Sequence, residues 1–347
     1  MKYTWVVLLI VIFSQGRNID SMVIGQGKMP AVTTDKDQNV HIVFGKGDSL
    51  LYSYSSDKGK SFSKPHLIEK LRGLNASAMR GPQITSTKDG LSVIGTSEDG
   101  KIHSWVCDRA GKWYKSGMVS DLDSVALEGF VSLASDGNNA FAVWLDLRGD
   151  KHNKIYGAGS TNGGKTWSEN MLIYQSPDSS VCECCKPSVR MNGQNVYVMF
   201  RNWINGNRDM YLVRSTDRGK TFGTETKIGN GSWPLKGCPM DGGNITISKN
   251  GEINTVWRRE NTIYACRAGA AEIPLGEGKG CSLESVNGEL AYIWINKAEI
   301  ICMLPDKKVI NVGKGSSASL KSIDDHTLLC TWENEGMIYC KMIKVSQ

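Results

Sequence analysis

Sulfur-containing side chains are concentrated in two short segments of this 347-residue chain. Cys182-Glu183-Cys184-Cys185 places three thiols within four residues, and Cys238-Pro239-Met240-Asp241 adds a thiol and a thioether. Thiolates and thioethers are ligands for soft metals such as Cu(I), whereas paired thiols form disulfides in an oxidising compartment. The two segments therefore predict either a structural disulfide such as Cys185–Cys238 or a soft-metal (copper) or redox site. In the second case His152 could add an imidazole ligand.

Arginines and carboxylates form a second group in similar segments. Arginine can hold a carboxylate through two parallel hydrogen bonds, and a nearby acid can donate or accept a proton. This combination is typical of a site for an anion or an acidic glycan. The candidate substrate-binding residues are Arg80, Arg148, Arg201, Arg208, Asp209 and Arg258. The candidate catalytic residues are Asp146, Glu128 and Glu260. The alternative is that pairs such as Arg201–Asp209 and Arg148–Asp146 are salt bridges between neighbouring loops, which are common.

An internal repeat indicates which elements carry these segments. A motif Ser-x-Asp/Asn-x-Gly-x-Ser/Thr-aromatic begins at residues 55, 160 and 215, and a decayed copy begins at 107. The steps between copies are 52, 53 and 55 residues, a period that is typical of repeat architectures. In each well-formed copy the carboxylate or amide can accept backbone N–H bonds and the glycine can adopt positive φ. Each copy therefore predicts a structural turn between two strands.

The motif belongs to a larger unit of short alternating strands bounded by Gly, Asn and Asp. Four such strands per unit predict a propeller blade. The unit occurs three more times after the motif has decayed, with middle strands at 253–257, 290–294 and 328–332. The fold class is therefore all-β, a β-propeller in a single domain over residues 17–347. Seven blades are favoured, and six remain the alternative if one late unit is not a blade.

The two ends of the chain indicate how the ring closes. Three late units finish on an apolar-Gly-x-Gly signature, at 228–231, 275–278 and 312–315. The seventh unit lacks it, but the signature occurs at 24–27. We expect residues 21–27 to form the outer strand of the last blade, because this pairing covers an otherwise open sheet edge.

The turn motifs resemble the Asp box (BNR repeat) of sialidase-like β-propellers, a resemblance that covers most of the mature chain. Sialidases have six blades. The resemblance implies a glycosidase site on the face opposite the boxes, with an arginine triad, an Asp acid/base and a Tyr nucleophile paired with Glu. Matching residues are Arg80, Arg201 and Arg258 for the triad and Asp146 or Glu128 for the acid. No Tyr stands in the equivalent late loop, where the sixth unit begins Gly278-Lys279-Gly280-Cys281.

The N-terminus and the overall charge bear on location and partners. A lysine, an apolar run over 5–13 and small residues at 14 and 16 predict a secretory signal peptide over residues 1–16. The protein is then exported (periplasmic, secreted or cell surface), with no membrane segment after cleavage. Its formal charge of +6 comes from scattered residues, which argues against nucleic-acid binding.

Three functions follow from these observations. The first is a sialidase-like glycosidase for acidic glycans, and the second is a non-catalytic propeller that binds glycans or proteins. The third is a thiol or soft-metal protein that uses the cysteine-rich loops. The expected partner is an acidic glycan or another carboxylate-bearing molecule, and the expected state is a monomer. No cofactor is required in the first two cases, and copper is the candidate in the third.

Overall fold

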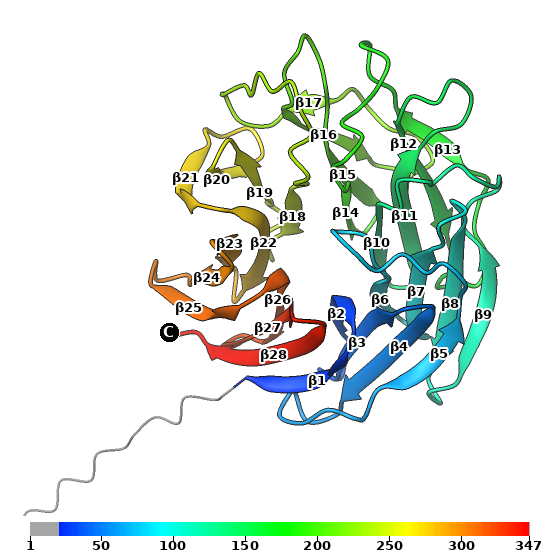
Figure 1. The fold of residues 1–347 in the computed structure, drawn as a ribbon, viewed down its shortest axis with the longest axis vertical. Coiled ribbons are helices and arrows are strands. Elements are labelled where there is room, and N and C mark those ends of the chain that lie inside the picture. Colours follow the sequence, from blue (N-terminus) through cyan, green and yellow to red (C-terminus); the bar gives the residue numbers. More distant parts are fainter. Residues whose placement is uncertain (1–20, 347) are drawn as a thin grey trace, which may run out of the picture.

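Short strands with alternating burial form seven four-stranded antiparallel sheets around a central axis (Figure 1). The computed structural model describes residues 21–346, and the predicted signal peptide lies outside the described residues. Among residues 21–346 no helix is long and apolar enough to cross a membrane. The predicted all-β propeller with seven blades, not six, is therefore confirmed.

Blades are numbered in chain order, and each strand lies farther from the axis than the one before it. Blade one is β2 (Lys28–Thr34), β3 (Val40–Lys46), β4 (Ser49–Ser55) and β5 (His66–Lys70). Blade two is β6 (Gln83–Thr87), β7 (Gly90–Thr96), β8 (Ile102–Asp108) and β9 (Trp113–Met118). Blade three is β10 (Val131–Asp136), β11 (Asn139–Asp146), β12 (Lys154–Ser160) and β13 (Met171–Tyr174). Blade four is β14 (Ser188–Asn192), β15 (Asn195–Arg201), β16 (Met210–Ser215) and β17 (Thr226–Lys227).

The remaining three blades follow the same order. Blade five is β18 (Asn244–Ile247), β19 (Ile253–Arg259), β20 (Thr262–Arg267) and β21 (Ile273–Glu277). Blade six is β22 (Lys279–Val286), β23 (Glu289–Asn296), β24 (Glu299–Met303) and β25 (Val309–Lys314). Blade seven is β26 (Ser316–Asp324), β27 (Thr327–Asn334) and β28 (Met337–Lys344), completed by β1 (Met22–Gln26).

The ring closes through the N-terminal strand, as the sequence predicts. β1 runs antiparallel to β28, with Met22 opposite Cys340 and Gln26 opposite Met337. The N–H of Gly27 then donates to the carbonyl of Gly336 at 2.8 Å. Because the edge of β28 is paired by a strand from the other end of the chain, blade seven has the same four strands as the others.

The apolar-Gly signature marks the place where an outer strand contacts the next blade. In β21, β25 and β1 the apolar residue lies in a β-bulge, and the next residue is the glycine. A Cβ added to Gly276 would lie 3.0 Å from the Trp294 ring of the next blade, and one on Gly313 would lie 3.2 Å from Trp332. Only glycine allows these rings to approach the outer strand so closely, which explains why the signature and the aromatic residue recur together.

The three turn motifs share one hydrogen-bond arrangement. The Ser55 hydroxyl accepts the N–H of Gly59 at 2.8 Å, and Asp57 accepts the N–H of Ser61 at 2.9 Å. The copies at Ser160 and Ser215 repeat both bonds. Hydrogen bonds from the Ser61 and Ser55 side chains hold the pKa of Asp57 at about 2. The Asp57 and Asp217 carboxylates and the Asn162 amide are therefore bonded within their own turns, on the face that we call the turn face.

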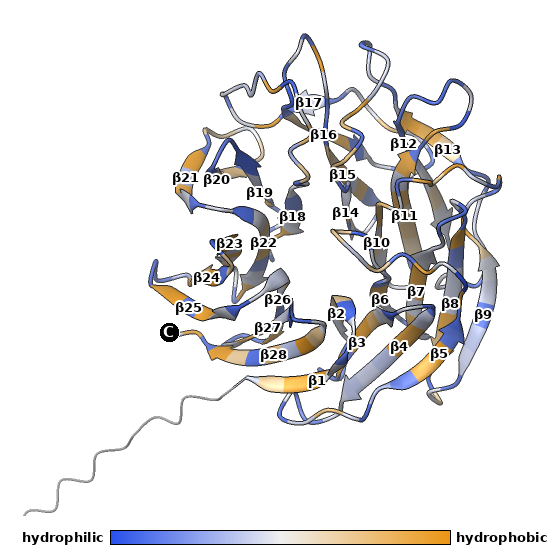
Figure 2. Cartoon of the chain, in the orientation of Figure 1, coloured by the Kyte–Doolittle hydropathy of each residue, from blue (hydrophilic) through white to orange (hydrophobic). Residues whose placement is uncertain are grey.

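Hydrophobic cores lie between adjacent blades. Phe141 and Val143 of blade three pack with Val198 and Phe200 of blade four. Figure 2 shows apolar residues along the strands of these blades. The face opposite the turn face is called the loop face. Its loops lead into each innermost strand or join the second strand of a blade to the third, and the packed sheets support them rigidly.

Candidate functional site

The innermost strands of all seven blades surround a channel of about 810 Å³. The first residues of these strands form its opening on the loop face, and we call this opening the channel mouth. Lys28, Lys186 and Lys279 stand here, each at or just before the start of an innermost strand. Arg190 lies farther along the same wall.

These three lysines have no carboxylate partner among residues 21–346. Lys186 donates instead to the amide oxygen of Gln83 at 2.8 Å. Burial and the charge of Arg190 lower the pKa of Lys186 to about 8. The ammonium is still the main form at neutral pH, so an anion entering the mouth would meet an incompletely compensated positive charge.

The carboxylates in the channel wall are occupied by protein groups. Lys321 lies 2.7 Å from Glu284, and Arg258 lies 3.3 Å from Asp241. Glu333 accepts the N–H of Met29 at 3.4 Å. The wall thus carries five basic side chains against three acidic ones, and the channel has an excess of positive charge. The basic residues are Lys28, Lys186, Arg190, Lys279 and Lys321.

Arg201 was expected to bind substrate, but its donors are used inside the protein. Its side chain is only 2% exposed, and its Nε and Nη2 atoms donate to the Asp241 carbonyl at 3.2 and 3.1 Å. Nη1 donates to the carbonyl of Arg208 at 2.8 Å, and Nη2 to that of Arg258 at 2.8 Å. Arg201 therefore ties together loops of blades four and five.

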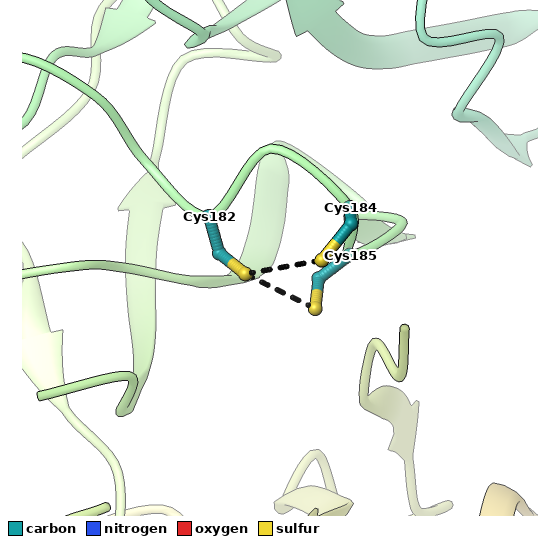
Figure 3. Close-up of side chains that lie close together, drawn as sticks. All are labelled: Cys182, Cys184 and Cys185. Atoms are coloured by element: carbon teal, nitrogen blue, oxygen red, sulfur yellow. Dashed lines mark hydrogen bonds between the residues drawn. The ribbon is translucent and has the colours of Figure 1, made fainter. Parts of the chain in front are cut away.

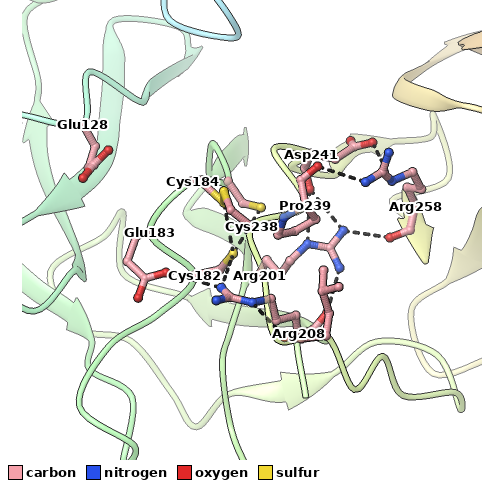
Figure 4. Close-up of a disulfide and its surroundings, with 12 residues drawn as sticks. Glu128, Cys182, Glu183, Cys184, Arg201, Arg208, Cys238, Pro239, Asp241 and Arg258 are labelled. Carbon is pink, nitrogen blue, oxygen red and sulfur yellow. Dashed lines mark hydrogen bonds and ion pairs between the residues drawn. A yellow bond between two sulfur atoms is a disulfide. The ribbon is translucent and has the colours of Figure 1, made fainter. Parts of the chain in front are cut away.

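Arg208 and Arg258 lie beside Arg201 (Figure 4). Arg208 donates from Nη1 to the Cys182 sulfur at 3.0 Å and to Glu183 at 3.3 Å. Arg258 pairs with Asp241 and donates to the carbonyl of Pro239 at 2.9 Å. Burial raises the pKa of Asp241, and Arg258 opposes this shift. The structure brings these three arginines together, but none of them lines the channel.

Asp209 and Arg80 belong to separate contacts. Asp209 accepts the N–H of Trp233 at 2.9 Å and pairs with Lys227 at 2.7 Å, and not with Arg201. Arg80 donates from Nε to the carbonyl of Glu128 at 2.6 Å and lies 3.6 Å from its carboxylate. Burial raises the pKa of Glu128, Arg80 opposes the shift and Glu183 adds to it. Glu128 is thus a half-buried acid on the loop face.

Asp146 and Arg148 form a closed pair in blade three. Asp146 has no exposed surface and accepts hydrogen bonds from the Trp144 indole at 2.8 Å and from Nε of Arg148 at 2.9 Å. Arg148 also pairs with Asp121 at 3.1 Å. Glu260 is exposed in the turn between β19 and β20. The catalytic roles of Asp146 and Glu260 stay predictions, and neither residue lines the channel.

Cys184 forms the disulfide with Cys238, across Cα atoms 6.1 Å apart, and joins blade four to blade five. The sequence predicted a disulfide such as Cys185–Cys238. The two loops are joined as expected, but the partner of Cys238 is Cys184 and not Cys185. The reason is that Cys185 is directed toward the protein interior, where its sulfur lies 3.3 Å from that of Cys182. Adjacent side chains diverge, and only Cys184 faces the neighbouring loop.

Cys182 has two sulfur neighbours, Cys185 at 3.3 Å and Cys184 at 3.8 Å (Figure 3). The hydrogen bond between Cys182 and Cys185, together with the charges of Arg208 and Arg201, lowers the pKa of Cys182 to about 7, against the effect of burial. Burial raises the pKa of Cys185 well above its usual value. Cys182 is therefore the thiol of the pair that ionises first.

The three sulfur atoms of Cys182, Cys184 and Cys185 lie within 4.8 Å of one another, and all three residues are buried. Such a set can hold a soft metal when the thiols are free. Of the other predicted ligands, Met240 is 43% exposed and belongs to the channel wall. His152 is exposed and is not a member of this sulfur group.

The lysines of the mouth were missed by sequence reasoning. Their signal is positional, because Lys28 and Lys279 are the first residues of innermost strands and Lys186 stands two residues before one. That position puts each side chain at the channel mouth once the blades are counted correctly.

Comparisons with known proteins show the fold alone. No protein-family model matches the sequence, and no curated protein does. A catalytically inactive virginiamycin B lyase from Staphylococcus aureus, with quinupristin, aligns at 12% identity and a TM-score of 0.57, over 94% of this chain and 100% of that one. An ulvan lyase bound to a GlcA–Rha3S sugar aligns at 10% identity and a TM-score of 0.55, over 93% of this chain and 94% of that one. The Aleuria aurantia lectin with Fucα1-6GlcNAc aligns at 9% identity and a TM-score of 0.55, over 85% of this chain and 98% of that one.

Proposed function

We propose that this protein is exported and binds an acidic glycan, or another carboxylate-bearing molecule, at the channel mouth. The observation that carries the proposal is the set of three lysines, Lys28, Lys186 and Lys279, without carboxylate partners among residues 21–346. Ammonium groups converging on one opening raise the local concentration of anions and bind them as point charges.

The size and polarity of the channel support a carbohydrate ligand. A volume of about 810 Å³ is within the range of small-molecule sites. Hydroxyl groups such as those of Ser86, Ser132 and Ser316 line the wall and can bond sugar hydroxyls. The ulvan lyase and the lectin show that propellers of this general shape hold sugars, including one with a uronic acid. Those ligands belong to those proteins, and here they support only the class of ligand.

We propose that the primary activity is binding of the glycan, and that hydrolysis of the glycan is tested separately. Asp146 is fully hydrogen-bonded, so the acid best suited to donate a proton is Glu128, whose pKa burial raises. A glycosidase of the usual type needs two carboxyl groups on either side of the scissile bond. Glu128 itself is not among the residues that line the channel.

The test combines a glycan array with fluorogenic sialosides and uronides, on the mature protein. Binding of acidic glycans without release of the fluorophore supports the proposal as stated. If the protein releases the fluorophore, and Glu128→Gln loses this release but still binds the glycan, the protein is also a glycosidase. Absence of any preference for acidic over neutral glycans contradicts the proposal. Export is tested separately, by comparing the location of the full chain with that of a chain lacking residues 1–16.

We also propose that the sulfur group Cys182, Cys184 and Cys185 can bind a soft metal such as Cu(I). The specific observation is that three buried sulfur atoms lie within 4.8 Å of one another. Metal analysis of the reduced protein, together with a thiol count, tests this second candidate independently of any glycan.

A further inference from the structure

The sulfur group contains two oxidation states of cysteine in direct contact. Cys182 and Cys185 are thiols, whereas Cys184 is bonded to Cys238. The Cys182 sulfur is 3.8 Å from Cys184 and 3.3 Å from Cys185. Tetrahedral metal sites have metal–sulfur bonds of about 2.3 Å, which place ligand sulfurs a little under 4 Å apart. The sulfur spacing therefore suits a metal, but in the disulfide form Cys184 is not a thiolate.

The charges around the sulfur group also suit an anionic metal–thiolate centre. Arg208 donates to the Cys182 sulfur at 3.0 Å. Arg201 is buried and bonded only to carbonyls, with no carboxylate partner in the described part of the chain. A buried cation without an anion is costly. Three thiolates and one monovalent cation carry a net charge of −2, which Arg201 and Arg208 can offset in part, since Arg208 also pairs with Glu183 at 3.3 Å.

The loops stay connected without the disulfide. Arg201 of blade four donates to the Asp241 carbonyl three residues beyond Cys238, at 3.2 and 3.1 Å. Arg258 also holds this segment, through the Pro239 carbonyl at 2.9 Å. Reduction of the disulfide therefore frees the two sulfurs while the segments that carry them remain joined.

We propose that the Cys184–Cys238 disulfide gates a soft-metal site formed by Cys182, Cys184 and Cys185. This inference rests on the proposed metal site and adds its regulation. A dithiol reductant transfers two electrons and two protons, the Cys184–Cys238 bond breaks, both cysteines become thiols, and the reductant becomes a cyclic disulfide. Cys184 can then bind a Cu(I) ion with its two neighbours, releasing protons as the thiolates coordinate.

The experiment measures Cu(I) affinity by competition with a chromogenic chelator, under argon, in two forms of the mature protein. One form is reduced with a dithiol that is then removed, and the other is left oxidised, with the thiols counted in both. Loss of an outer partner alone weakens metal binding about 10- to 100-fold. We therefore expect the oxidised form to bind at least roughly 100-fold more weakly than the reduced form.

Cys238→Ser separates the gate from the site. This variant leaves Cys184 as a thiol in either condition, so we expect it to bind Cu(I) without reductant. The matched control is Cys266→Ser, a buried thiol in β20 whose hydrogen bonds to the Arg267 and Ala270 carbonyls a serine can keep. We expect this control to depend on the reductant as the unaltered protein does.

The outcomes distinguish the gate from the metal site. Equal affinity in the reduced and oxidised forms, or a Cys238→Ser variant that still requires reductant, overturns the gate and leaves the metal site standing. Absence of binding both in the reduced protein and in folded Cys238→Ser overturns the metal site and the gate together.

Discussion

Nη1 of Arg208 donates a hydrogen bond to the sulfur of Cys182 at 3.0 Å. Arg208 comes from the loop between β15 and β16, and Cys182 from the loop that leads into β14. Since both loops belong to blade four, one blade supplies the thiol and the cation that stabilises its ionised form. This contact distinguishes Cys182 from the other buried thiols, whose pKa values burial raises.

Replacing Arg208 should raise the pKa of Cys182. An adjacent opposite charge typically shifts a pKa by about 1–3 units, so Arg208→Met should move thiolate formation from about pH 7 upward by roughly one unit or more. Arg208→Lys, which keeps the charge, should recover part of the shift. Thiolate absorbance against pH measures this midpoint, and an unchanged midpoint in Arg208→Met would show that Cys185 and Arg201 set it without Arg208.

Arg201→Lys should destabilise the protein. The guanidinium bonds three carbonyls of two blades, and an ammonium in its place cannot reach all of them. Loss of buried hydrogen bonds to a charged group should lower the free energy of unfolding by roughly 2–4 kcal/mol. Chemical denaturation measures it, with Arg214→Lys, at the exposed position of β16, as the control. A variant as stable as the unaltered protein, but deficient in glycan binding, would contradict the structural role.

Much of the ring could be predicted from the sequence, because its signals are local. The turn motifs have their own hydrogen bonds, and the glycine of the outer strand recurs with the aromatic residue that contacts it, as in Gly313 and Trp332. The site was harder, since the availability of an arginine depends on acceptors from distant loops. Nothing near Arg201 in the sequence reveals that Asp241 will supply a carbonyl to it. The choice between Cys184 and Cys185 likewise depends on backbone direction.

Ring closure by β1 should be cooperative. Deleting residues 21–27 removes the pairing with β28 and the burial of Ile24, which is 6% exposed. Loss of a buried isoleucine alone costs about 2–5 kcal/mol, so the whole domain should melt at a clearly lower temperature in one transition. A truncation that stops at residue 20 is the control. Identical melting of the two truncated proteins would contradict closure by this strand.

The turn at Asp57 should contribute its full stability only above acidic pH. Hydrogen bonds hold the pKa of Asp57 at about 2, below its ordinary value of 3.8. A lowered pKa means that the stabilising carboxylate is fully present above about pH 4 and is lost as the pH falls through about 2. Asp57→Asn should therefore show a smaller drop in melting temperature between pH 5 and pH 2 than the unaltered protein, without a change in ligand binding at pH 7. Equal pH dependence, or lost binding, would contradict this assignment.

The central claim is that Lys28, Lys186 and Lys279 at the channel mouth bind an anion. The direct measurement is calorimetric titration with an acidic glycan and its neutral counterpart, for the unaltered protein, Lys186→Gln and the exposed control Lys308→Gln. A hydrogen bond to a charged group contributes about 1.5–3 kcal/mol, so Lys186→Gln should weaken binding of the acidic glycan about tenfold or more. The neutral glycan should bind weakly to all three proteins, and Lys308→Gln should behave as the unaltered protein does. Equal binding of the acidic glycan by Lys186→Gln and the unaltered protein would contradict the account.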